Sequence, residues 1–440
     1  MKLVLHPDIR IRKEEFGSIL LVPLELERPE IPQFFKVNKI GTIIIEHCRS
    51  PITLDNLIKE IRDKYKTDNG EGIKIFVNHL VQVGILRDIK SNHTMMPLTF
   101  PIKKEDLRNT PKLSSPLSAF VELSDKCVLK CIHCYTRSEN KPIPSQQKQW
   151  ISDILCHLSE IGVLTIGLGG GEPTLDPNLS SYIKYCSSVG IKTAISTSGV
   201  LVTDAMAFEL KESGLGIAQI SIDGTLQIHD HIRGKGTYKK AINALELFSK
   251  LGVETRVAMT VSAVNWRYIA ETAESAFKHG SDRFVVFRYM PSGRGGARLS
   301  LSREELKKIT EQLIALQESH PETVIGYEPL CFYPHLIKND LAPLSPCNAG
   351  SDILNICADG TVTPCPHIRN YCLGKYPEES LNNIWERAKV VGRNILFNPP
   401  DECIGCRFVK KCGGGCSWNL RDTSTRKKDI MCWKDVNLKE

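Results

Sequence analysis

Three cysteines lie close together, at Cys127, Cys131 and Cys134, with three and then two residues between them. This spacing lets one loop place three thiolates around one cube of iron and sulfur, and it leaves the fourth iron without a protein ligand. An open iron can chelate the amino and carboxylate groups of methionine, whereas a cluster held by four cysteines serves electron transfer. Zinc is the alternative, but a structural zinc site has four protein ligands, and His133 is awkwardly placed to be the fourth.

Polar and glycine-rich motifs follow the cysteines at the ends of expected strands. The first runs Gly-Gly-Gly-Glu-Pro over 169–173, where Gly170 and Gly171 let the backbone approach a ligand closely and Glu172 can accept hydrogen bonds from an ammonium group. Further along, a guanidinium at Arg233 suits a carboxylate because its donors form a planar fork. A surface ion pair is the alternative for this arginine.

A second set of cysteines fills the C-terminal region. Its spacing is Cys-x12-Gly-x4-Cys, followed by Cys-x2-Cys-x5-Cys-x3-Cys-x15-Cys, and its members are Cys347, Cys365, Cys403, Cys406, Cys412, Cys416 and Cys432. Asp359-Gly360 predicts the turn of a β-hairpin that carries Cys365 on its second arm. Zinc-ribbon knuckles are the alternative to iron–sulfur ligation here.

The composition favours metal ligation over disulfides. The chain has 440 residues and 16 cysteines, and its N-terminus has neither the apolar stretch nor the cleavage site of a signal peptide. With no apolar run of about 18 residues, no membrane span is indicated, so we expect a cytoplasmic protein, in which disulfides are disfavoured. The net charge of +7 is carried by scattered residues, and we expect no nucleic-acid or membrane partner.

The middle of the chain, residues 117–300, alternates strands with helices. Apolar strands are predicted at 119–123, 164–168, 192–196, 217–222, 254–261 and 284–287, and helices between them at, for example, 179–189, 204–213, 238–251 and 266–279. This order implies α/β architecture with a parallel sheet and right-handed crossovers. Six units fit a partial (β/α)6 TIM-like barrel, in which ligands lie at the C-terminal ends of the strands.

Four further segments complete the expected organisation. Residues 1–95 read as three short strands, at 9–12, 18–22 and 33–37, followed by three helices at 39–48, 53–65 and 72–83, which is a winged-helix-like pattern. Residues 96–116 read as a linker and 301–344 as a bridging helical segment. Residues 345–440 lose the α/β alternation and gain cysteines, which is typical of a domain held together by metal.

The triplet and the motifs after it resemble the radical S-adenosylmethionine (SAM) superfamily. The resemblance implies a [4Fe–4S] cluster that binds SAM, cleaves it reductively and yields a 5′-deoxyadenosyl radical, with Cys127, Cys131 and Cys134 as cluster ligands. It also implies SAM contacts from the Gly-Gly-Glu motif, from the Thr-Ser-Gly and Ser-x-Asp-Gly motifs that end the third and fourth strands, and from an aromatic beside the adenine. The implied set is Tyr135, Gly170, Gly171, Glu172, Thr197, Ser221, Asp223 and Arg233. Relatives often have asparagine where Ser198 stands, which weakens the expected ribose contact.

The C-terminal cysteines resemble the SPASM extension, which houses two auxiliary [4Fe–4S] clusters. The resemblance assigns Cys403, Cys406, Cys412 and Cys432 to the distal cluster. It assigns Cys347, Cys365 and Cys416 to the proximal one. The fourth proximal ligand stays open between Cys357, Cys372, Cys331 and a substrate thiolate.

The N-terminal pattern is similar to PqqD-like domains, named after the small pyrroloquinoline-quinone chaperone, which bind a leader peptide as an added strand. An ordinary winged-helix domain is the alternative. The three parts in this order resemble sactipeptide maturases of the subtilosin type, which implies a Cys sulfur-to-Cα thioether in a ribosomally made precursor peptide and a flavodoxin- or ferredoxin-type electron donor. A carbon–carbon crosslink, a β- or γ-thioether, sulfatase-maturase-like oxidation, haem- or quinone-pathway chemistry on a small molecule and a non-catalytic binding module remain as alternatives.

Overall fold

The computed structural model describes residues 1–22, 34–65, 70–89, 113–139, 147–320, 324–328, 347–406, 409–417, 427–429 and 432. The chain divides into two compact units, Met1–Ser114 and Ser115–Glu440. Most of the expected linker, like Cys331, lies outside the described residues.

The first unit contains two small antiparallel sheets. One has the order β2 (Arg10–Glu14), β3 (Gly17–Leu21) and β4 (Phe34–Asn38), and these are the three strands that the sequence predicts. The other has the order β5 (Ile52–Thr53), β1 (Lys2–Leu5) and β6 (Leu86–Asp88). The second sheet was not predicted, because strands of two to four residues carry too little periodicity to be recognised.

Three helices complete this unit, as the sequence predicts: α1 (Lys39–His47), α2 (Leu54–Tyr65) and α3 (Gly70–Gln82). Asn38 caps α1, since its side-chain oxygen accepts a hydrogen bond from the Gly41 N–H at 2.8 Å. Thr53 starts α2 in the same way and accepts from the Asn56 N–H at 3.3 Å. Apolar residues of both sheets and all three helices form one core, including Leu20, Ile44, Leu57, Val77 and Leu80.

The second unit is built on a parallel sheet. Its successive strands are β7 (Ser118–Ser124), β8 (Thr165–Gly170), β9 (Lys192–Thr197), β10 (Ile217–Ser221), β11 (Glu254–Val261), β12 (Arg283–Arg288) and β13 (Val324–Glu328), each paired in parallel with its neighbours. The first six confirm the predicted barrel strands. Residues such as Val121, Ile166, Ile195 and Ile220 are fully buried, as is typical of a parallel sheet covered on both faces.

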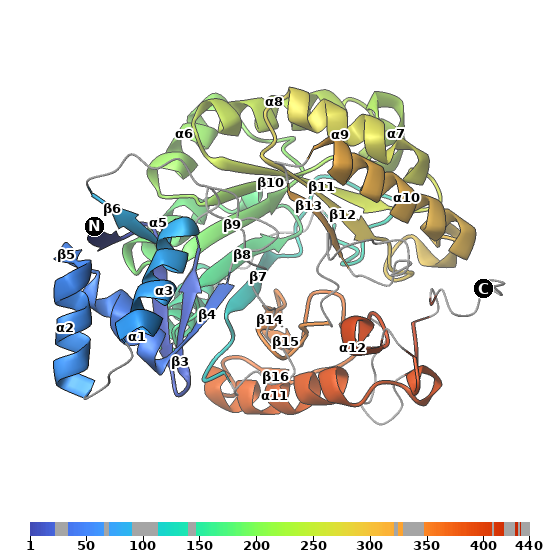
Figure 1. Cartoon of the computed structure of the whole chain (residues 1–440). Coiled ribbons are helices and arrows are strands. Elements are labelled where there is room, and N and C mark those ends of the chain that lie inside the picture. The colour runs from blue at the N-terminus through green and yellow to red at the C-terminus, as the bar shows by residue number, and fades with distance from the viewer. Residues whose placement is uncertain are drawn as a thin grey trace. The chain divides into compact units, whose positions relative to one another are not determined.

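The sheet extends beyond the six predicted strands at both edges (Figure 1). β13 pairs with β12, so the segment expected to be a helical bridge holds a strand as well as helix α10 (Arg303–Ser319). At the other edge, β14 (Ile353–Ile356) pairs in parallel with β7, and β15 (Thr361–Thr363) and β16 (Gly374–Lys375) follow antiparallel. The cysteine-rich C-terminal region therefore continues the barrel sheet directly.

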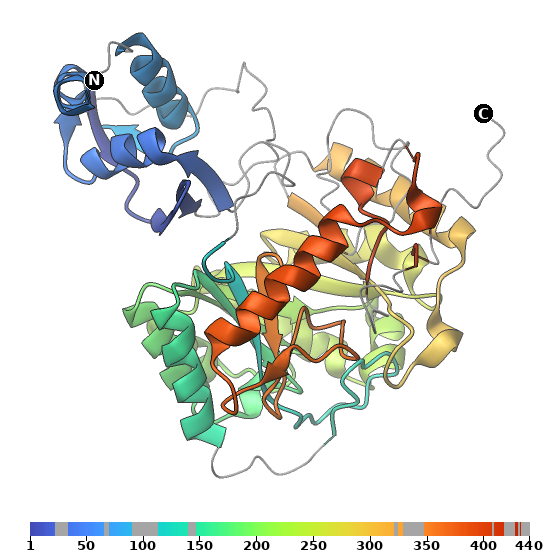
Figure 2. The same ribbon diagram turned by 90° about the horizontal axis from the view of Figure 1, so that it is seen from below.

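Helices connect the strands and pack on the sheet. They are α4 (Gln147–Glu160), α5 (Leu179–Ser188), α6 (Asp204–Glu212), α7 (Leu226–Arg233), α8 (Thr237–Lys250) and α9 (Ile269–Lys278). Two C-terminal helices follow, α11 (Leu381–Phe397) and the short α12 (Val409–Cys412). Figure 2 shows α11, in orange-red, crossing in front of the barrel. Among the described residues, no helix has the length and apolar character needed to cross a membrane.

Candidate active site and iron–sulfur ligands

The three clustered cysteines lie on the loop that follows β7, at the carboxyl end of the first barrel strand. The ends of this loop are held together, because the Cys127 N–H donates to the Glu139 carbonyl at 2.9 Å and the Glu139 N–H donates to the Asp125 carbonyl at 3.2 Å. Cys131 is buried, while Cys127 and Cys134 are half-buried. The fold thus gathers three thiols into a single closed loop.

These thiols influence one another electrostatically. The pKa of Cys127 is raised to about 11, mainly by burial and in part by the neighbouring Cys131 and Cys134. Burial also raises the pKa of Cys131. Thiols that resist ionisation when alone become thiolates when iron binds, so the donor chemistry and the placement fit a [4Fe–4S] cluster.

In the described parts of the chain, no three His, Cys, Asp or Glu side chains are placed to hold a single metal ion. A cube-shaped cluster offers a separate iron to each thiolate, so its ligands do not converge on one point.

The glycines of the Gly-Gly-Gly-Glu-Pro motif admit the cysteine loop. The Gly171 N–H donates to the Ser124 carbonyl at 2.7 Å, and the Glu172 N–H donates to the Lys126 carbonyl at 2.8 Å. A Cβ at Gly171 would lie 2.0 Å from the Lys126 carbonyl oxygen, and one at Gly170, whose φ is +110°, would lie 2.5 Å from that of Ser124. The two glycines therefore leave room for the backbone of the cysteine loop, which approaches them closely at Ser124 and Lys126.

Glu172 is buried and its carboxylate is fully engaged. Oε1 accepts from the Thr174 hydroxyl at 2.7 Å and the Thr197 hydroxyl at 2.5 Å, and Oε2 accepts from the Ser198 N–H at 2.9 Å and the Ser198 hydroxyl at 2.5 Å. The expected contact of Glu172 with the methionine ammonium would therefore share oxygens that already tie β8 to the end of β9.

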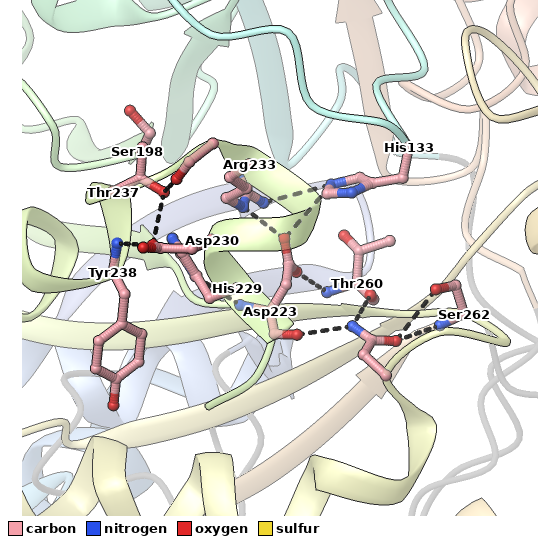
Figure 3. Close-up of polar contacts among 12 residues, drawn as sticks. His133, Ser198, Asp223, His229, Asp230, Arg233, Thr237, Tyr238, Thr260 and Ser262 are labelled. Carbon is pink, nitrogen blue, oxygen red and sulfur yellow. Dashed lines mark hydrogen bonds and ion pairs between the residues drawn. The ribbon is translucent and has the colours of Figure 1, made fainter. Parts of the chain in front are cut away.

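Asp223 organises the end of β10 (Figure 3). Its Oδ2 accepts from the Arg233 Nε at 2.5 Å, and its Oδ1 accepts from the Thr260 N–H at 2.8 Å. Its carbonyl accepts from the Asn265 side chain at 2.9 Å. Burial raises the pKa of Asp223, but the charge and hydrogen bond of Arg233, together with the neighbouring His133 and His229, outweigh burial and the net pKa is lowered. Asp223 thus positions Arg233, whose guanidinium carries further N–H donors for a ligand carboxylate.

Two histidines lie next to the Asp223–Arg233 ion pair. His133 Nε2 lies 3.6 Å from Asp223 Oδ2, and His229 Nδ1 accepts from the Asp223 N–H at 3.2 Å. The pKa of His133 and of His229 is lowered to about 4, mainly by burial and in part by the positive charge of Arg233. Both rings are therefore neutral at neutral pH.

The histidine pKa values predict acid sensitivity of the fold. His229 has a pKa of about 4 when folded and about 6.5 when unfolded, so its contribution to stability is complete above pH 6.5 and is lost as pH falls toward 4. We expect His229→Asn, whose oxygen can still accept from Asp223, to remove up to about 1.4 kcal/mol per pH unit from the slope of unfolding free energy in this window. Urea unfolding at pH 7, 6 and 5 measures the slope.

The control for this experiment is His231→Asn, on the same helix but exposed. The control should keep the wild-type slope. Equal slopes for all three proteins would contradict the assignment of acid sensitivity to His229.

Tyr135 connects the cysteine loop to the C-terminal region. Its ring lies 5.3 Å from the His367 ring and 5.7 Å below the Arg369 guanidinium. Arg369 in turn forms a two-pronged ion pair with Glu122 of β7, with N–O distances of 2.5 and 3.1 Å. Burial raises the pKa of Tyr135, so its phenol stays protonated. Arg369, from the C-terminal region, therefore contacts both Glu122 on the first barrel strand and Tyr135, the aromatic residue that follows the cysteines.

The other two residues expected to contact SAM lie at the ends of strands. Thr197 ends β9 and donates to Glu172, as described above, while Ser221 ends β10 and is half-buried. Because parallel strands present their carboxyl ends at one edge, Thr197 and Ser221 lie at the same carboxyl-terminal edge of the sheet as the cysteine loop.

The seven C-terminal cysteines separate into two groups. The pKa of Cys403 is raised to about 11, mainly by burial and in part by Cys432, Cys412 and Cys406. Burial also raises the pKa of Cys416, and there the contributing thiols are Cys347 and Cys365. The structure thus brings the four cysteines of the expected distal set together and the three of the proximal set together.

Two other cysteines were expected as options for the fourth proximal ligand. Cys357 is buried, accepts from the Asn355 side chain at 3.3 Å, and has its pKa raised to about 12, first by burial and then by Glu122. Cys372 is exposed and donates to the Gly374 carbonyl at 3.4 Å.

Besides Arg369, two further residues that brace these sites were missed in the sequence. Arg294 follows β12 and donates to the carbonyls of Cys131 at 2.9 Å and Ser138 at 2.8 Å. Asp429 is buried and pairs with Arg288, the last residue of β12, through N–O distances of 2.6 and 3.0 Å. The glycine-rich run around Arg294 was an available signal of close backbone approach, but Asp429 lies in an ordinary polar stretch.

Comparison with known proteins identifies two domains. Residues 121–276 match the Radical SAM superfamily, and residues 347–407 match the SPASM iron–sulfur cluster-binding domain.

Curated relatives carry several names. The mycofactocin maturase MftC of Mycolicibacterium smegmatis is 27% identical over 313 residues, which cover 69% of this chain and 79% of the relative. The AdoMet-dependent heme synthase of Oleidesulfovibrio alaskensis is 25% identical over 318 residues, covering 67% and 80%. The sporulation killing factor maturation protein SkfB of Bacillus subtilis is 28% identical over 282 residues, covering 63% and 66%.

The fold is shared with solved structures. SuiB of Streptococcus suis, bound to the precursor peptide SuiA, superposes with a TM-score of 0.69 at 19% identity and covers 98% of this chain and 100% of its own. This likeness confirms the expected α/β architecture. With a SAM-binding [4Fe–4S] cluster and auxiliary iron–sulfur clusters as its cofactors, the chain is an enzyme that carries a radical SAM domain followed by a SPASM domain.

Proposed function

We propose that this enzyme modifies a ribosomally made precursor peptide by joining a cysteine sulfur to the Cα of another residue. The carrying observation is that its fold matches SuiB over 98% of the chain, including the structure in which SuiB holds a precursor peptide. Relatives named as the maturases MftC and SkfB support the same substrate class. The thioether itself rests on the resemblance of the Cys412-Gly-Gly-Gly-Cys416 run to the Cys-Gly-Gly-Cys region of subtilosin-type maturases, which has one glycine fewer.

The SAM site is proposed at the carboxyl edge of the barrel sheet. A cluster on Cys127, Cys131 and Cys134 together with SAM supplies a 5′-deoxyadenosyl radical when both are bound. Arg233, held by Asp223 through Nε, would direct its remaining donors to the methionine carboxylate, joined by the Ser221 hydroxyl. Glu172 and Thr197 would face the ammonium and ribose, and Tyr135 the adenine.

The auxiliary ligands are proposed as two groups of cysteines, and the effects of their thiols on one another's pKa support this grouping. Cys403, Cys406, Cys412 and Cys432 would complete the distal cluster with four thiolates. Cys347, Cys365 and Cys416 would hold the proximal one and leave one iron for a further thiolate, which a peptide cysteine can supply. A flavodoxin- or ferredoxin-type protein in the cytoplasm would deliver the electrons.

The first unit is proposed as a PqqD-like leader-binding domain. In the described residues, β4 is the edge strand next to β3, and a leader strand would pair with its other edge. Phe76 of α3 lies beside the start of α1, where a Cβ at Gly41 would meet its ring at 3.0 Å and Val37 of β4 at 3.2 Å. Ile75 precedes Phe76 on α3, about 100° around the helix from it, and is 64% exposed. An apolar leader side chain packed there would give specificity to a strand paired with β4.

The experiment is an anaerobic assay of the reconstituted, reduced enzyme with SAM and candidate precursor peptides that contain cysteine. We expect 5′-deoxyadenosine and a peptide lighter by about two daltons, because forming the S–C bond removes one hydrogen from sulfur and one from carbon. Fragmentation that places the loss on a Cys–Cα pair supports the thioether. A two-dalton loss with every cysteine still alkylatable would instead indicate a carbon–carbon crosslink.

A variant arm of the same assay tests the leader site. Ile75→Asp should weaken peptide binding by about tenfold or more, while SAM cleavage without peptide stays at the wild-type rate. The matched control is Tyr65→Asp, at a 44% exposed apolar side chain on α2 of the same unit. Equal binding by both variants would argue against α3 as the leader site.

Haem-pathway chemistry is the second candidate, because relatives include an AdoMet-dependent heme synthase and an Fe-coproporphyrin III synthase. An assay in which an iron porphyrin replaces the peptide distinguishes the two candidate functions. Decarboxylation or another mass change in the porphyrin, with no change in any peptide, would favour this candidate.

A further inference from the structure

A pair of hydroxyl groups lies against the last cysteine of the loop. Thr136 Oγ1 is 3.3 Å from Cys134 Sγ and 2.6 Å from Ser138 Oγ. Ser138 is buried. The two hydroxyls and the sulfur therefore form a short hydrogen-bonded chain.

The direction of this chain follows from the chemistry of the sulfur. An iron-bound cysteine carries no proton, so Cys134 Sγ can only accept a hydrogen bond. Thr136 must then donate its single hydroxyl proton to the sulfur. Its oxygen is left to accept the proton of Ser138, which orients the Thr136 hydroxyl toward Cys134.

The backbone between the two hydroxyls is held in an unusual conformation. Arg137 has a φ of +56°, in the left-handed region that residues other than glycine rarely adopt. The segment after β12 holds it there, because Arg137 donates to the Gly293 carbonyl at 3.1 Å and Arg294 donates to the Ser138 carbonyl at 2.8 Å. Strain of this kind persists where the surroundings fix the turn, and it is concentrated at functional sites.

We propose that Thr136, oriented by Ser138, raises the reduction potential of the cluster on the Cys127–Cys131–Cys134 loop. Reduction adds negative charge that is shared by the ligand sulfurs, and a hydrogen bond to a sulfur stabilises that charge. The inference rests on the proposed cluster ligands and is independent of which peptide or bond the enzyme forms.

The test is a redox titration of the holoenzyme carrying Thr136→Val, which removes the hydroxyl and keeps the shape of the side chain. Electron paramagnetic resonance follows the reduced-cluster signal that changes when SAM is added, since that response distinguishes this cluster from the auxiliary ones. At the wild-type midpoint, we expect the ratio of reduced to oxidised cluster to fall about tenfold, which is about 59 mV for one electron.

The controls separate tuning from a general structural defect. Thr136→Ser keeps the hydroxyl and should restore the wild-type ratio, and Ser138→Ala should shift the ratio in the same direction as Thr136→Val by a smaller factor. An unchanged ratio in Thr136→Val with full iron, or an equal shift in Thr136→Ser, would overturn the proposal. If Thr136→Val fails to hold iron, an unchanged ratio in Ser138→Ala overturns it. None of these readings depends on peptide modification.

Discussion

Replacement of Cys127, Cys131 and Cys134 by alanine together is expected to abolish formation of 5′-deoxyadenosine from SAM. These thiols share one closed loop after β7 and influence one another electrostatically, and alanine offers iron no ligand. The iron content should fall by about four atoms, from about twelve to about eight per chain. The auxiliary cysteines lie on a different part of the chain, so their iron should remain.

Anaerobic reconstitution, iron analysis and mass spectrometry of the nucleoside products measure this result. The matched control is Cys156→Ala, because Cys156 is half-buried like Cys127 and Cys134 but lies on α4, outside all three groups. The control should keep the wild-type iron content and SAM cleavage. SAM cleavage by the triple variant would refute the ligand assignment, and loss of all its iron would show that the clusters assemble together.

Much of the barrel could be predicted because parallel strands buried on both faces produce continuous apolar runs. The first six strands, β7 to β12, correspond to such runs, and the helices between them have amphipathic periodicity. The pairing of β14 with β7 joins residues more than 230 positions apart, as Ile353 opposite Ser118 shows. No local pattern in the sequence specifies so distant a partner, and the four-residue strand is too short to stand out.

The candidate site was predictable where spacing imposes chemistry, as in the cysteine loop and the Gly-Gly-Glu motif. It was not predictable where a residue acts through one long-range contact. Arg369 and Asp429 look like ordinary surface residues in the sequence, yet Arg369 pairs with the fully buried Glu122 and Asp429 with Arg288. A single charged residue gives no periodic signal, so only the fold shows its partner.

These two ion pairs share a role in the second unit. Each joins a strand of the barrel to the cysteine-rich region, through Glu122 on β7 and Arg288 on β12. Arg369 also lies over Tyr135, next to the cysteine loop, while Asp429 contacts the auxiliary cysteine region. The C-terminal region is therefore fixed to the barrel at both the proposed SAM site and the proposed auxiliary sites.

Asp429→Ala is expected to loosen both groups of auxiliary cysteines. The Asp429 carboxylate accepts a hydrogen bond from the Cys416 N–H at 3.0 Å, and the main-chain carbonyl of Asp429 accepts one from the Cys432 N–H at 2.9 Å. Its ion pair with Arg288 is almost fully buried, with side chains 1% and 3% exposed. Removal of one partner from a buried pair costs about 3–5 kcal/mol, because the other charge is left in a medium that solvates it poorly.

Hydrogen–deuterium exchange of the holoenzyme, read by mass spectrometry on the peptides that contain Cys416 and Cys432, measures the local opening. A loss of this size corresponds to about 100-fold or more faster exchange where opening limits it. Asp429→Asn keeps an acceptor for the Cys416 N–H but removes the charge, so its exchange should lie between the wild type and Asp429→Ala. The control is Glu378→Ala, which breaks an exposed pair with Lys375 worth at most about 1 kcal/mol. Equal exchange in Asp429→Ala and Glu378→Ala would show that the buried pair does not hold the auxiliary region, and faster exchange confined to Asp429→Ala with preserved iron would separate its bracing role from ligation.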